Sequence, residues 1–281
     1  MKFGVREICD VVFKATTDGQ RVGENTYKKY EPVFYIDTAK TSTLEGAATT
    51  VYAQGGKGNT RLLAWEGEKT LTFTVEDALL SPLGFSMLTG AGLTKATQAV
   101  HTTVTVNTGN ASGEITLTSG SLEDGETVNL STGHVAYGTI VDDAGAVISS
   151  LGSGSVTGTS TSGSNTLVFK FGSTNLTGKN VVLDFYVDKA VQNMDIEAGK
   201  FAGYYYVEAS TLFRDQNSTL DLPAEIIIPK AKIQSNFTFS MASTGDPSTF
   251  SFVMDAFPAV TKNSGTKQVL AEIQVVADAT I

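Results

Sequence analysis

In the stretch Lys69-Thr70-Leu71-Thr72-Phe73-Thr74-Val75, polar and apolar side chains alternate from Thr70 onward. A two-residue period places Leu71, Phe73 and Val75 on one face of an extended chain and the threonines on the other. This pattern predicts a strand with one buried face. The same period recurs at residues 203–212, 224–233, 237–241, 249–254 and 268–276. The C-terminal third is therefore predicted to be a β meander.

One segment breaks the strand pattern. The apolar residues between positions 79 and 88 are spaced as on a helix, and Ser81 supplies a cap residue that is followed by proline. Gly90 supplies a stop. We predict one short helix over Pro82–Thr89, and the same spacing allows an extra turn at residues 76–80.

The composition indicates a folded, mainly β chain. Of the 281 residues 41% are hydrophobic, with 15 Phe and 9 Tyr, and Thr and Val recur throughout. These residues fit a pleated, half-buried surface, and this length can bury one large or two modest cores. A formal charge of −9 disfavours sequence-independent binding to nucleic acid, which requires Lys and Arg to displace phosphate counterions.

Cysteine usage and hydropathy predict where the chain folds. Cys9 is the only cysteine, which excludes an intrachain disulfide and fits a reducing cytoplasm. We expect it to be a small buried hydrophobic residue. No run of about 18 apolar residues occurs, and the N-terminus lacks the apolar stretch of a signal peptide. We therefore expect neither secretion nor membrane insertion.

The middle of the chain changes in composition to Thr, Ser and Gly. Residues 97–189 hold eight acidic residues against Lys170, Lys179 and Lys189, and short strand candidates are separated by turn signals. We predict a small β-sandwich domain at 97–189, on the outer surface, inserted into a discontinuous β core of residues 1–96 plus 190–281. The alternative is a long set of extra strands in one domain.

Residues 38–62 are rich in Gly, Ala and Thr yet contain Val51 and Tyr52. A loop of this length in a compact domain is more often functional than idle. If the segment forms a β-hairpin arm, its own domain offers no obvious place to bury it, whereas a partner subunit would.

No catalytic or metal-binding constellation is present. His101 and His134 are the only histidines, and neither lies at a metal-ligand spacing. The Gly-Lys turns at 56–58 and 178–180 lack the flanking residues of a phosphate-binding loop. The acidic pairs at 123–124 and 142–143 fit hydrated turns better than calcium or catalytic sites. We predict no enzyme activity and no cofactor.

Trp65 is the only tryptophan. It could stack on a sugar ring, but the flanking Leu62, Leu63 and Ala64 favour an anchor in the core or at a subunit interface.

The order of these parts resembles bacteriophage tail tube proteins, also called major tail proteins. Two blocks carry the resemblance, in the order glycine-rich arm, strand, helix and closing hairpin. The first is QGGKGNTRLLAWEGEK at 54–69 running into LTFTVEDALLSP at 71–82. The second is PAEIIIPKAKI at 223–233, followed by FTFSM at 237–241 and GDPSTFSF at 245–252. The match covers about residues 1–95 and 190–281, and the middle looks like an optional surface domain.

The resemblance implies a β-sandwich or barrel core with a flanking helix and a long β-hairpin arm near residues 38–66. It implies subunits that join into hexameric rings, and rings that stack into a hollow tube in the virion tail, through which DNA passes without specific binding. A tape-measure protein, and a sheath protein if the tail is contractile, would be partners. The interface candidates are Tyr52, Asn59, Arg61 and Trp65.

Two other functions compete with a self-assembling tube subunit. A β-sandwich binding module, either a capsid decoration protein or a host-surface adhesin, would form discrete monomers or trimers. A carbohydrate-active enzyme would require two carboxylates facing each other across a cleft.

Overall fold

A computed structural model describes residues 2–5, 7–90, 92–118, 129–130, 135–161, 164–217, 219–238, 243 and 249–276. The fold is mainly β with one α-helix among these residues, as predicted. The chain divides into two compact units, Met1–Thr94 with Asn193–Ile281, and Lys95–Gln192. Placement of the second unit on an outer surface stays a prediction.

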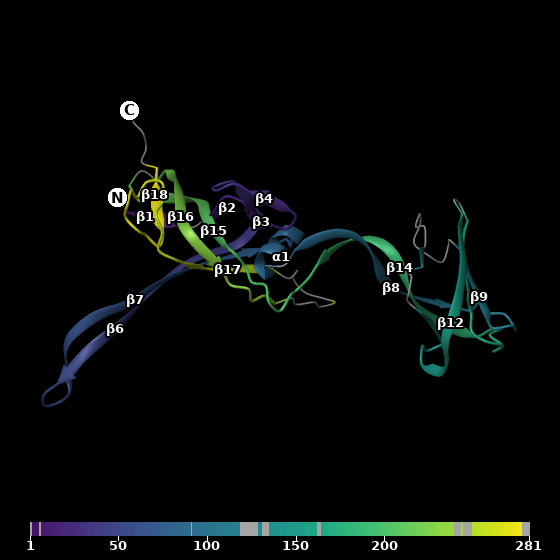
Figure 1. Ribbon diagram of the computed structural model, residues 1–281. Coiled ribbons are helices and arrows are strands. Elements are labelled where there is room, and N and C mark those ends of the chain that lie inside the picture. Colours follow the sequence, from purple (N-terminus) through teal and green to yellow (C-terminus); the bar gives the residue numbers. More distant parts are fainter. Residues whose placement is uncertain are drawn as a thin grey trace. The chain divides into compact units, whose positions relative to one another are not determined.

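The first unit is built on a nine-stranded antiparallel sheet whose main path has the order β5-β2-β15-β16-β17-β7-β6, with β1 paired to β15 and β18 to β16 (Figure 1). A separate two-stranded sheet joins β3 and β4. The strands are β1 Phe3–Val5, β2 Asp10–Ala15, β3 Gln20–Val22, β4 Asn25–Tyr27, β5 Pro32–Ile36, β6 Ala39–Gly55, β7 Thr60–Asp77, β15 Tyr204–Asp215, β16 Asp221–Ile233, β17 Phe250–Ala256 and β18 Glu272–Val275.

Alternation decides which face of this sheet is buried. In β2 the side chains of Val11, Phe13 and Ala15 are buried, while those between them are half-buried. In β7 the predicted inward positions Phe73 and Val75 are buried, and Leu71, where the strand leaves the sheet, is only half-buried. The strand predicted at 237–241 is not formed at Phe237 and Thr238, and its remaining residues lie outside the described part of the chain.

The helix α1 has the predicted bounds, Pro82–Thr89, and lies on the core of the first unit. The Ser81 hydroxyl accepts a hydrogen bond of 2.9 Å from the Gly84 N–H, and Gly90 ends the helix at φ 71°. A Cβ atom on Gly84 would lie 2.9 Å from the Phe34 ring, so the missing side chain lets the helix approach the sheet closely. The extra turn at residues 76–80 is absent, because Glu76 and Asp77 still pair with β17.

Removing the cap of α1 gives a first prediction. Ser81→Ala should lower the free energy of unfolding by about 1 kcal/mol, because the Gly84 N–H loses its acceptor. Ser81→Asp restores an acceptor and is the matched control. Urea unfolding followed by circular dichroism measures both, and equal loss in the two variants would contradict the capping role.

The second unit is a seven-stranded sheet with the main order β10-β14-β11-β12-β13-β9, in which β8 pairs with β14. Its own buried cluster includes Ile115, Leu117, Phe169, Leu183 and Phe185, separate from the cluster of the first unit. The strands are β8 Leu93–Val106, β9 Glu114–Thr118, β10 Asn129–Leu130, β11 Ala136–Val141, β12 Val147–Thr161, β13 Ser164–Lys170 and β14 Asn180–Met194. Each unit therefore has a hydrophobic core of its own.

Candidate functional site

Strands β6 and β7 continue to pair with each other beyond the sheet. Strand β17 pairs with β7 only between Thr72 and Asp77, whereas the β6–β7 register runs on from Glu45 opposite Thr72 to Gly55 opposite Thr60. Residues 45–72 therefore form a projecting hairpin (Figure 1). At about 3.4 Å per residue its ten-residue reach is roughly 30 Å.

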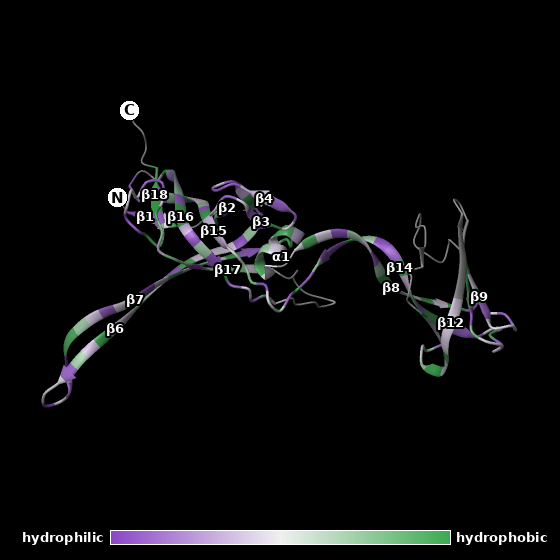
Figure 2. Ribbon diagram, viewed as in Figure 1, coloured by the Kyte–Doolittle hydropathy of each residue, from purple (hydrophilic) through white to green (hydrophobic). Residues whose placement is uncertain are grey.

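The projecting hairpin has no core in its own subunit. From Lys40 to Thr72, all of which the structure describes, no residue is buried. The exposed fraction is 63% for Val51, 63% for Leu62, 62% for Leu63 and 54% for Trp65. Figure 2 shows apolar segments on the hairpin far from the sheet. Large apolar side chains gathered in this way mark an interaction surface.

The register collects the apolar side chains on one face. Trp65 lies opposite Val51, and two residues along each strand Leu63 lies opposite Ala53. Because paired residues share a face and alternate residues return to it, these four side chains form one apolar face. Leu62 lies at the irregularity next to Ala53, where β7 has one extra residue.

The opposite face is polar and aromatic. The guanidinium of Arg61 lies over the ring of Tyr52, 4.0 Å from its centroid, and this cation–π contact orders both side chains. In the turn, Asn59 has a φ of 47°, and its backbone N–H donates to the Gly56 carbonyl at 3.2 Å. Its side-chain amide donates to the side-chain oxygen Oε1 of Gln54 at 3.4 Å.

A bulge shapes the base of the hairpin. Between the pairs Ala48–Lys69 and Thr50–Glu66, the single residue Thr49 lies opposite two residues of β7. The Thr49 hydroxyl accepts a hydrogen bond of 2.9 Å from the N–H of one of them, Glu68. A Cβ atom at Gly67 would lie 2.5 Å from that hydroxyl oxygen, so a larger residue there would displace the Thr49 hydroxyl. Bulges bend and twist a ribbon, so this one sets the direction of the hairpin.

The hairpin tip, residues 51–65, is cationic in an acidic chain. It contains Lys57 and Arg61 and no carboxylate, whereas the whole chain has a formal charge of −9. The tip is therefore both apolar and positive, and it complements a surface that is apolar and negative.

The four interface candidates named from the sequence all lie on this hairpin. Tyr52 and Arg61 are in contact, Trp65 belongs to the opposite face, and Asn59 lies in the turn. Trp65 is exposed, so it is not an anchor in the core of its own subunit. Sequence reasoning missed Val51, Leu62 and Leu63 as members of the surface. The consecutive apolar residues 62–65 were the available signal.

Residues considered for chemistry occupy structural positions. His101 is an exposed residue of β8, and its Nε2 atom lies 2.9 Å from an Asp184 carboxylate oxygen. Asp142 closes a turn by accepting the N–H groups of Ala144 and Ala146. Cys9 is buried with a free thiol, as predicted. His134, Glu123 and Asp124 lie outside the described residues.

The two Gly-Lys segments are turns, as predicted. Gly56 and Gly58 have φ values of 80° and 92°, and the Lys179 N–H donates to the Leu176 carbonyl. Across the described residues, no group of three His, Cys, Asp or Glu side chains could hold a metal ion. In the same part of the chain, no helix has the length and apolar character needed to cross a bilayer.

Comparison with known proteins gives a match over nearly the whole chain. The family model described as the YomU/Tube protein family matches residues 4–273. No curated protein matches the chain.

Proposed function

The chain belongs to the YomU/Tube protein family, in agreement with its resemblance to phage tail tube proteins, and from this membership we propose how it assembles and works. It is a structural component of the virion tail. Six subunits close into a ring, and the rings stack into a hollow tube that delivers the genome into the host cell. The observation that carries this proposal is the projecting hairpin, whose apolar face is exposed in the single subunit.

Open sheet edges support ring formation. The main path of the sheet in the first unit ends at β5 on one side and β6 on the other. Unpaired edges invite pairing with another chain, and a closed ring satisfies every edge without further growth sideways. In this proposal neighbouring subunits in the ring meet along such edges.

The projecting hairpin supports contacts beyond the subunit. A reach of roughly 30 Å at strand spacing is enough to cross onto a neighbouring subunit or ring. Burial of Val51, Leu62, Leu63 and Trp65 there removes apolar surface from water, which is the main driving force of most association.

Net charge supports a conduit for DNA. A chain of formal charge −9 repels phosphates, so a genome moves past it without sticking. We expect the residues that line the lumen to be net acidic. An assembly whose lumen is lined by net basic residues would contradict this expectation.

Other components complete the proposal. Rings polymerise on an initiator complex around a tape-measure protein, and a sheath protein surrounds the tube if the tail is contractile. The second unit lies on the outer surface. Membership in a tube family implies a structural role without catalysis.

Mass photometry of the purified protein tests the ring. Six-fold multiples of the 29.6 kDa chain mass are expected as concentration rises. Stable monomers or trimers at every concentration would contradict the ring and favour the binding-module alternative.

A further inference from the structure

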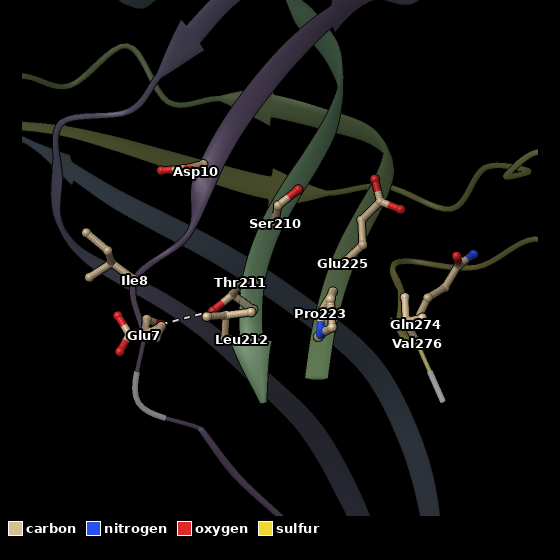
Figure 3. A pocket seen from close by; sticks show the side chains of 11 residues that line it. Glu7, Ile8, Asp10, Ser210, Thr211, Leu212, Pro223, Glu225, Gln274 and Val276 are labelled. Atoms are coloured by element: carbon tan, nitrogen blue, oxygen red, sulfur yellow. Dashed lines mark hydrogen bonds between the residues drawn. The ribbon is translucent and has the colours of Figure 1, made fainter. Parts of the chain in front are cut away.

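A groove of about 620 Å³ crosses the sheet of the first unit on strands other than β6 and β7 of the projecting hairpin (Figure 3). Its floor is set by the register of four adjacent strands. Ser210 on β15 lies opposite Asp10 on β2 and Glu225 on β16, and Glu225 lies opposite Gln274 on β18. These side chains form one polar row across the sheet.

A second row lies two residues along each strand. Leu212 is opposite Pro223, whose carbonyl accepts the Val276 N–H at 2.8 Å. The exposed fraction is 40% for Leu212, 57% for Val276 and 42% for Ile8. The Thr211 hydroxyl donates to the Glu7 carbonyl at 3.0 Å, which holds this segment beside β15. The groove therefore has an apolar row next to a polar one.

The groove is negatively charged. Its lining residues, all within the described chain, include Glu7, Asp10 and Glu225 and no basic side chain. The phenol of Tyr35 next to it has a raised pKa, first through desolvation and then through the charges of Asp10 and Asp37. An apolar and anionic groove favours an occupant that is apolar and cationic.

The hairpin tip is both apolar and cationic. In a single subunit the tip does not occupy the groove, and both the tip and the groove are exposed. We propose that the groove formed by β2, β15, β16 and β18 receives the hairpin tip of a second copy of the chain. Leu63 and Trp65 pack on the apolar row, and Lys57 in the hairpin turn faces the carboxylates. This inference rests on the proposed tube, because it identifies the surface to which the hairpin of a neighbouring subunit binds.

Cysteine cross-linking tests the contact. In a Cys9→Ala background, Leu63→Cys and Leu212→Cys are combined in one chain, assembled and oxidised. A ladder of covalent oligomers on a non-reducing gel is the expected result. Leu63→Cys with Leu79→Cys is the matched control, because Leu79 is 65% exposed but lies outside the groove, and it should give no ladder.

Charge exchange tests the pairing independently of cysteine chemistry. Lys57→Glu and Glu225→Arg should each raise the concentration needed for assembly at least about tenfold, and the double variant should recover most of the loss. Lys179→Glu, in the second unit, is the control and should assemble normally. Thermal melting confirms that each variant is folded.

The outcomes separate the two proposals. Wild-type protein that never forms rings or tubes contradicts both. Tubes that form normally, without a ladder and without recovery in the double variant, overturn the docking of the hairpin tip in the groove and leave the tube in place.

Discussion

Trp65→Ala is expected to raise the concentration needed for polymerisation by roughly thirtyfold while leaving the folded subunit almost unchanged. Trp65 is 54% exposed on a hairpin without a core, so its truncation removes little from the free subunit. Buried tryptophan anchors contribute about 2 kcal/mol or more at interfaces, and exposed substitutions change stability by about 0.5 kcal/mol or less. The midpoint of thermal unfolding should therefore move by only about 1–2 °C.

Pelleting of polymers over a concentration series, together with thermal melting of the unassembled protein, measures both effects. Tyr137→Ala is the matched control, because Tyr137 is an aromatic residue that is 52% exposed on the second unit. The opposite pattern, a large drop in melting temperature with unchanged polymer yield, would place Trp65 in a core and remove it from the interface.

Phe13→Ala should have the largest effect on stability, destabilising the first unit by about 3–5 kcal/mol. The Phe13 side chain is fully buried, and its ring lies about 6 Å from those of Phe34, Tyr205 and Phe252, at 5.9, 6.0 and 5.9 Å. Because the two units have separate cores, the loss should stay within the first.

Hydrogen exchange with mass spectrometry localises this loss. Amides of β15 and β16 should lose protection, while those of β14 in the second unit keep it. Phe169→Ala, which removes a ring 5.0 Å from that of Phe185, should give the reverse pattern. If either variant released both units together, the two cores would not be energetically independent.

Local chemistry made the helix and several strands predictable from the sequence. The helix has its expected bounds because a serine cap, a proline and a glycine stop act within a few residues. The strand β17, Phe250–Ala256, also lies close to its expected range, residues 249–254, where apolar alternation is clear.

Strand β12 was not predicted, because its own sequence carries no strand pattern. Its sequence, VISSLGSGSVTGTST at 147–161, is dominated by Ser, Gly and Thr and lacks an apolar period. Hairpin pairing with the preceding β11 and the following β13 holds it in the sheet. Strand propensity is overridden by such neighbours.

The candidate site was predictable in composition but not in geometry. The Gly-rich segment and Trp65 indicated a hairpin that needs a partner, and the structure shows that hairpin without buried residues. Exposure of Leu62 and Leu63 could not be read from the sequence, because it depends on where β17 stops pairing with β7. The groove brings together residues 7–10, 210–212, 223–225 and 274–276, which only the strand order makes neighbours.

Negative-stain electron microscopy of the purified protein over a concentration series tests the central claim most directly. A tube subunit should give rings, and then hollow tubes of constant diameter, as the concentration rises. Small particles that persist at every concentration would contradict assembly into a tube.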